Sequence, residues 1–236
     1  MNKDLETTSM ELLCDVRRQL DDALTSLRGR RASSMLDNFL VGMAIYINQA
    51  TESYILLRKA SKTDGSRLLI RPAIEAMIQI LAVRKYPPLL YRIAYTEADE
   101  HGRWACFPSI KAGKDYDAEE TKKLSGFKRE YMAQFPEHTL VDQRLSLPEA
   151  AEAALGDKGY YDRFYRLYCK FTHPGLAAIA GSLDHFATED SPTMAACVFC
   201  GLEAVASVGG VAPNLDSLRS RLFSMEESGS ARKESP

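Results

Sequence analysis

The sequence predicts an all-α protein, a multi-helix bundle of about 7–9 helices around a central buried helix at residues 66–85, with a peripheral helical insertion. Three observations lead to this fold class. Apolar residues recur every three or four positions along most of the chain, residues 66–85 are apolar on nearly all sides, and prolines or glycines separate the periodic segments. The 236 residues are long enough for one self-sufficient core, expected at 1–225, followed by a disordered tail at 226–236.

The first two helices are predicted from their periodicity and their ends. Residues 5–27 carry apolar side chains near three-and-four spacing, with charges between them, and this helix is expected to end near Gly29. Ser33 or Ser34 can cap a second helix, because a serine hydroxyl accepts a hydrogen bond from the backbone N–H groups of a first turn. The second helix then runs to about Ala60.

The central helix is expected to begin after a break at Asp64-Gly65. A helix that is apolar all round lies inside a bundle or a membrane. Three charges interrupt any run of the roughly 18 apolar residues that a membrane span needs, namely Arg67, Arg71 and Glu75. The bundle is therefore the better interpretation.

The segments after Tyr86-Pro87-Pro88 alternate between helices and connections. They are predicted in order as a helix at 89–101, a loop at 102–116, a surface helix at 117–134, a connection at 135–147 and a short helix at 148–155. Residues 104–156 form the expected peripheral insertion.

The last part of the chain is predicted to hold helices at 160–172, 176–186 and 191–209. His173-Pro174-Gly175 separates the first two, because the residue before a proline is pushed away from helical geometry. The helix at 191–209 is built from small residues that permit close helix contact, with Glu203 alone in its middle. A membrane span is the competing interpretation of this helix, and Glu203 opposes it because an acid is costly in lipid.

Composition and charge restrict the class of protein. The 30 basic and 32 acidic residues give a net charge of −2, which argues against a surface wholly dedicated to nucleic acid and leaves a local basic patch open. The five cysteines are scattered and odd in number, which favours a reducing compartment. The first residues, 1–8, are charged and no apolar signal-peptide segment follows, so we expect a soluble cytoplasmic protein.

A polar stripe on the central helix is the first candidate site. Its members recur every four residues: Arg67, Arg71, Glu75 and Gln79. Arg71 and Glu75 can pair at this spacing, and buried charges need partners. Pro72 lacks an N–H group and would leave the carbonyl of Leu68 free if the helix extends that far back. The stripe indicates either a polar binding pocket that uses Arg71 and Glu75 or a structural ion pair that fixes the helix register.

His173 is the second candidate. It follows an aromatic helix, with Arg166 seven positions before it and Tyr165 and Tyr168 on adjoining turns. A histidine there could act as a general acid or base, or interact with the negative end of the helix dipole. We expect Arg71, Glu75 and His173 to form one core site, with Tyr165 and Tyr168 as binding residues.

Other chemical motifs are missing from the sequence. Cys197-x-x-Cys200 has no second pair and lies in an apolar segment, so a zinc site is not expected. No pair of Glu-x-x-His elements, phosphate-binding glycine loop or serine-hydrolase motif is present. The sequence therefore predicts neither a metal nor a cofactor.

Two short segments carry a resemblance. Residues 71–75, Arg-Pro-Ala-Ile-Glu, and residues 165–175, a tyrosine-rich stretch that reaches His173, resemble bacterial all-helical families of unknown function. Those families show an Arg-x-x-x-Glu helix and a Tyr-containing helix that ends in histidine. The resemblance covers residues 40–205 and implies no particular activity.

A looser resemblance is to HEPN proteins, helical domains whose ribonuclease members carry an arginine and a histidine on one helix with four to six residues between them. Arg166 and His173 have six residues between them, while Leu167 stands where a polar residue is usual. This resemblance implies a metal-independent endoribonuclease of a toxin or antiphage system, with Arg166 and His173 as catalytic residues and RNA as its partner.

Three functional hypotheses remain open. The first is a helical protein of unknown role with a polar core site. The second is the HEPN-like ribonuclease. The third is a non-catalytic interaction module that forms a homodimer through its small-residue helix at 191–209. The sequence does not decide whether Glu203 joins the buried polar residues.

Overall fold

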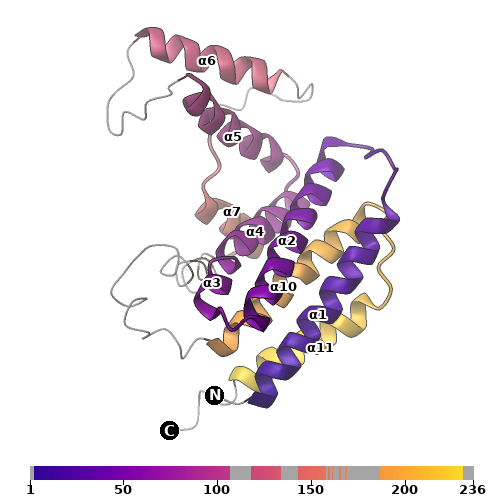
Figure 1. The fold of residues 1–236 in the computed structure, drawn as a ribbon. Coiled ribbons are helices and arrows are strands. Elements are labelled where there is room, and N and C mark those ends of the chain that lie inside the picture. The colour runs from indigo at the N-terminus through magenta and orange to yellow at the C-terminus, as the bar shows by residue number, and fades with distance from the viewer. Residues whose placement is uncertain are drawn as a thin grey trace.

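The computed structural model describes residues 3–106, 118–133, 143–157 and 187–230, together with Gly159, Tyr161, Tyr165 and Tyr168. Every regular element in these residues is a helix, which confirms the predicted all-α bundle (Figure 1). The helices are α1 (Lys3–Ser26), α2 (Met35–Lys59), α3 (Thr63–Arg67), α4 (Ile70–Lys85), α5 (Leu89–Cys106), α6 (Ala118–Met132), α7 (Leu147–Leu155), α10 (Ala187–Ser207) and α11 (Leu215–Ser230).

The core lies where four long helices meet. Helix α10 packs against α1, α2 and α4, and α2 also packs against α4. Helix α11 runs along α1 and α10, α7 covers another side of α4, and α5 with α6 projects away from the bundle (Figure 1). No helix in the described part of the chain combines the length and the hydrophobicity that a membrane crossing requires.

Helix α10 uses its small residues for contacts within the chain. A Cβ atom placed on Gly201 would lie 3.5 Å from Leu20 Cδ2 of α1 and 3.6 Å from Ala44 Cα of α2. Ala195 and Ala204 are fully buried in the same core. The close helix contact predicted from these small residues thus occurs inside this chain, and homodimer formation through them stays a prediction.

The predicted central helix is divided in two. Helix α3 ends at Arg67 and α4 begins at Ile70, so the expected single helix at 66–85 was wrong at its start. The break places Pro72 in the first turn of α4, where a missing N–H group breaks no helical hydrogen bond. Leu68 lies in the turn and is 45% exposed, whereas most apolar side chains of α4 are buried. Asp64-Gly65, expected to interrupt the chain, lies within α3.

The predicted insertion at 104–156 contains parts with different surroundings. Helix α5 continues to Cys106, so the loop expected from residue 102 does not start there. Helix α6 packs on α5, where Lys128 Nζ donates to Asp99 Oδ1 at 3.1 Å. Helix α7, by contrast, belongs to the bundle, because its residues Ala150 and Ala151 are buried in the main hydrophobic core.

The C-terminal helices begin and end elsewhere than predicted. Helix α10 starts at Ala187 instead of Ser191, and Pro192 lies inside it. As the sixth residue of α10, Pro192 lies beyond the four N–H groups that have no partner within a helix, so it removes one helical hydrogen bond. Helix α11 reaches Ser230 and overlaps the start of the 226–236 segment expected to be disordered. The predicted helices at 160–172 and 176–186 lie outside the described residues, apart from three tyrosines.

A capping box begins α7. Glu149 N–H donates to Ser146 Oγ at 3.4 Å, while Ser146 N–H donates to a Glu149 carboxylate oxygen at 2.9 Å. Hydrogen bonds from Ser146 hold the pKa of Glu149 down to about 2, against an ordinary value of 4.5. The carboxylate therefore contributes stability above pH 4.5 that is lost as the pH falls towards 2.

We expect Ser146→Ala to lower the free energy of unfolding by about 1 kcal/mol at neutral pH, because the first turn of α7 loses its cap. The Glu149 side chain is 51% exposed, so solvent screening keeps this effect small. Urea denaturation at about pH 6 and about pH 3 should show a smaller difference from the wild type at the lower pH. An equal difference at both pH values would contradict the role of the carboxylate.

Candidate functional site

The predicted polar stripe spans α3 and α4, and its members differ in burial. The Arg67 side chain is 1% exposed, while those of Arg71 and Glu75 are 27% and 35% exposed. Gln79 is half-buried one turn further along α4. The stripe therefore contains one fully buried charge, Arg67, and a half-buried pair, Arg71 and Glu75. The surroundings of Arg67 and of the Arg71–Glu75 pair are different.

Arg67 is held by a buried carboxylate. Arg67 Nε donates to Asp190 Oδ2 of α10 at 2.9 Å, and Asp190 is 0% exposed. The hydroxyl of Tyr168 donates to Asp190 Oδ1 at 3.1 Å. Burial raises the pKa of Asp190 above its ordinary value, and the hydrogen bond from Arg67 opposes this shift. Burial also raises the pKa of Tyr168, so its phenol stays protonated and continues to donate.

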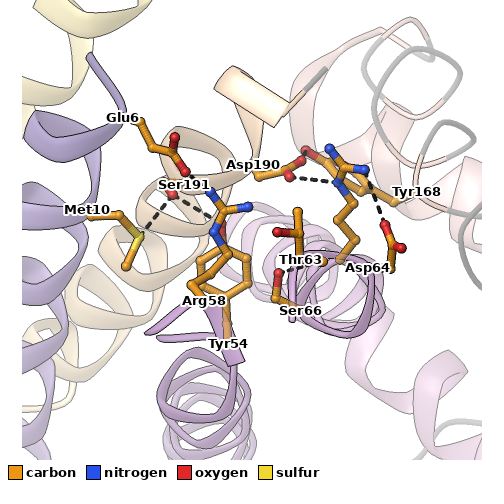
Figure 2. A network of polar contacts seen from close by, with 11 residues as sticks. Glu6, Met10, Tyr54, Arg58, Thr63, Asp64, Ser66, Tyr168, Asp190 and Ser191 are labelled. Atoms are coloured by element: carbon orange, nitrogen blue, oxygen red, sulfur yellow. Dashed lines mark hydrogen bonds and ion pairs between the residues drawn. The ribbon is translucent and has the colours of Figure 1, made fainter. Parts of the chain in front are cut away.

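Further polar contacts surround this pair (Figure 2). The hydroxyls of Tyr54 and Ser191 are hydrogen-bonded at 3.0 Å, and Ser191 Oγ donates to Met10 Sδ at 3.1 Å. Beside them, Arg58 of α2 forms an ion pair with Glu6 of α1. These contacts connect α1, α2 and α10 around the Arg67–Asp190 pair.

Arg71 and Glu75 form a second network with Tyr165. Arg71 Nε lies 3.2 Å from Glu75 Oε1 and 3.1 Å from the Tyr165 hydroxyl oxygen, and donates to both. The Tyr165 hydroxyl donates to Glu75 Oε1 at 2.5 Å. Tyr161 stacks on Tyr165 with ring centroids 4.8 Å apart. Each pair of atoms in this triad is therefore within hydrogen-bond distance.

The two networks have the same composition: an arginine of the stripe, a carboxylate and a tyrosine. Arg67 and Arg71 are four residues apart, and Tyr168 and Tyr165 are three residues apart. The two networks therefore take their arginines from neighbouring positions of the same stripe.

A pocket of about 340 Å³ lies beside the half-buried network. It is lined by Glu75, Gln79, Ile93, Thr96, Glu97, Glu100, Leu145, Ser146, Leu147, Ala150 and Tyr165. Its described lining thus comes from α4, α5, the 143–146 segment, the start of α7 and Tyr165. Thr96 Oγ1 accepts from the Leu145 N–H at 3.0 Å and so fixes the 143–146 segment at the pocket wall.

Several oxygen atoms in the pocket can accept hydrogen bonds beyond those that the described residues donate. Among the contacts of the described residues, Glu75 is bonded through Oε1 alone, and neither Gln79 nor Glu100 has a hydrogen-bond partner. Glu97 accepts one bond, from the Tyr131 hydroxyl at 3.3 Å. The described lining thus carries three carboxylates and no lysine or arginine.

The structure brings together three of the predicted site residues, Arg71, Glu75 and Tyr165. Tyr168 contacts Asp190 instead. Arg166 and His173 lie outside the described residues, so their predicted roles stay predictions.

The sequence analysis missed Asp190 and the pocket side chains of α5. Asp190 lies 123 residues from Arg67, so no local sequence pattern connects the two. The only feature of the sequence that could have indicated a buried role for Asp190 is its position next to an apolar helix. A helix was predicted at 89–101, but Thr96, Glu97 and Glu100 were given no role in a site. They do share one side of α5 by their spacing, which could have suggested a second polar wall.

The structure also describes the surroundings of Glu203 and of the two cysteines of α10. Glu203 is bound by Arg84 at 3.3 Å and by Arg219 at 2.5 Å, so it lies outside both networks. Burial raises the pKa of the Cys197 thiol, and that of Cys200 to about 12, which keeps both thiols protonated. Within the described residues, no group of three or more His, Cys, Asp or Glu side chains is arranged to hold a metal ion.

Comparison with known proteins found one family. The model of a family described as a family of unknown function, DUF5677, matches residues 37–191, a range that contains every residue of the two arginine networks. Comparisons with the curated proteins and with the solved structures found no match.

Proposed function

This chain belongs to DUF5677, a family of unknown function, and we propose that it binds a small molecule in the pocket lined by Glu75, Gln79 and Tyr165. The observation that carries the proposal is the Arg71–Glu75–Tyr165 triad, which is half-buried at the wall of a concave space. Ligand sites are typically concave spaces in which a small number of convergent polar groups fix the orientation of the ligand.

The difference in burial between the two networks favours binding over a purely structural role. Arg67 and Asp190 are fully buried and anchor α3 to α10, so the fold already has its buried ion pair. Arg71 and Glu75 remain open to solvent, and an ion pair of that kind adds about 0–1 kcal/mol to stability. Stability alone therefore gives little reason for a triad at this position.

We expect Glu75→Gln to abolish ligand binding while it changes the free energy of unfolding by less than about 1 kcal/mol. The test is a ligand-observed NMR screen of the full chain against a library of small organic acids, amines and sugars, followed by urea denaturation. The proposal predicts hits that are lost in Glu75→Gln and in Tyr165→Phe.

The matched control is Glu52→Gln, which neutralises a carboxylate on α2 that pairs with Arg17. This variant should keep every hit. A loss of more than about 2 kcal/mol in Glu75→Gln, with no hit that depends on Glu75, would instead assign the triad to the structural role.

The ribonuclease and the interaction-module hypotheses stay predictions. The HEPN-like mechanism depends on Arg166 and His173, which lie outside the described residues. Cleavage of RNA that is lost in His173→Ala would support it. Sedimentation at micromolar concentration would test the homodimer.

A further inference from the structure

We infer that the ligand of this pocket is a small organic cation, an alkyl amine or alkyl guanidine with at least two N–H donors. The inference rests on the proposed function and adds the chemical class of the ligand. Four features of the described pocket support it, namely its charge, its spare acceptors, its apolar wall and the way it already binds a guanidinium group.

The charge of the pocket selects for cations. Glu75, Glu97 and Glu100 line it, and Arg71 offsets only the first of them. Glu75 and Glu97 are half-buried, which reduces the dielectric screening between their carboxylates and a bound ligand and strengthens their attraction for a cation, while Glu100 is exposed. A carboxylate or phosphate ligand would be repelled by the same groups.

The spare acceptors define where the N–H groups of the ligand bind. Glu75 Oε2 accepts no hydrogen bond from the described residues, and the Gln79 side chain has none either. The two residues are one helical turn apart and both line the pocket, so they lie next to each other on α4. A guanidinium or ammonium group can donate to both at once.

The apolar part of the lining suits a short alkyl chain. The apolar residues of the described lining are Ile93, Leu145, Leu147 and Ala150. The volume of about 340 Å³ is near the lower end of ligand sites, so the ligand is small. Burial of the alkyl chain on these side chains would contribute a hydrophobic term to binding.

Arg71 provides an internal example of the inferred recognition. Its guanidinium is bound by the Glu75 carboxylate, and its Cζ lies 5.3 Å from the centroid of the Tyr165 ring. A carboxylate beside an aromatic ring is a common arrangement for the binding of organic cations. The same wall therefore has the chemistry needed to hold a second, exogenous cation through its unused acceptors.

The experiment is isothermal titration of the full chain with agmatine, which carries a guanidinium and an amine on a short alkyl chain. Glutarate, of similar length and opposite charge, and Mg²⁺ are titrated in parallel. We expect agmatine to bind and glutarate not to bind. Gln79→Leu and Glu97→Gln should each weaken agmatine binding roughly tenfold or more, because each removes an acceptor from a charged donor.

The matched control is again Glu52→Gln, which should bind agmatine like the wild type. Circular dichroism establishes that each variant is folded. Binding of glutarate that depends on Tyr165, without binding of agmatine, would overturn the inference and leave the proposed function standing. Binding of Mg²⁺ at Glu97 that agmatine cannot displace would also overturn it. If no probe and no library compound binds at Glu75, both are wrong.

Discussion

Asp190→Ala is expected to lower the free energy of unfolding by about 3–5 kcal/mol, the cost typical of removing one partner of a buried ion pair. The variant removes the buried carboxylate that accepts from Arg67 Nε and leaves this guanidinium, 1% exposed in the wild type, with the exposed carboxylate of Asp64 at 3.7 Å. It also removes the acceptor of the Tyr168 hydroxyl. A charge that loses its partner in the interior retains its full desolvation cost, because water cannot replace the lost contact.

Urea denaturation of the purified chain measures this effect, with Asp216→Ala as the control. Asp216 pairs with Arg219 on the surface of α11 and its side chain is 96% exposed, so its removal should cost less than about 1 kcal/mol. A cost below about 1 kcal/mol for Asp190→Ala would show that the buried pair contributes little.

A double variant separates the lost interaction from the cost of an unpaired charge. Arg67→Met combined with Asp190→Leu removes both charges and fills the space with apolar atoms. Burial raises the pKa of Asp190 despite the hydrogen bond from Arg67, which indicates a large desolvation cost for the carboxylate. We therefore expect the double variant to be more stable than Asp190→Ala.

Ile78→Ala is expected to lower the free energy of unfolding by about 2–5 kcal/mol. Ile78 lies in the middle of α4, is 0% exposed and belongs to the main hydrophobic core. The substitution removes three carbon atoms from the side chain and leaves a cavity that the packed helices around α4 fill only in part. Both the lost transfer free energy and the cavity contribute to the cost.

The same denaturation experiment tests this prediction, with Leu81→Ala as the control on the same helix. Leu81 is half-buried, so its truncation removes less buried surface and should cost clearly less than that of Ile78. Equal costs for the two variants would contradict the position of Ile78 at the centre of the core.

The two arginine networks divide structural and binding roles along one helical stripe. The Arg67–Asp190–Tyr168 network is buried and connects α3 to α10. The Arg71–Glu75–Tyr165 network is half-buried and borders a pocket. Substitutions in the first should therefore reduce stability, and substitutions in the second should reduce binding with little loss of stability.

Local sequence patterns determined the fold class and most helix positions. Periodic apolar residues predicted α1 and α2 closely, and Ser34, one of two expected caps, does accept a hydrogen bond from the Asp37 N–H at 3.1 Å. The four-residue spacing of the stripe also predicted that Arg71 and Glu75 could pair, which they do. These features depend on residues within one or two turns of each other, which is why the sequence alone reveals them.

Only the tertiary structure decided which partners the stripe meets. Tyr165 reaches Arg71 across 94 residues and Asp190 reaches Arg67 across 123, and no periodicity connects positions so far apart. The break between α3 and α4 at Leu68 likewise depends on how the two helices pack, although Pro72 indicated its neighbourhood. The sequence by itself determined a helical bundle with a charged stripe on a buried helix. The packing of α10, α5 and α7 around that stripe decided that Arg67 is buried and that Glu75 faces a pocket. The burial of a charge depends on contacts between distant parts of the chain, and no local sequence pattern encodes those contacts.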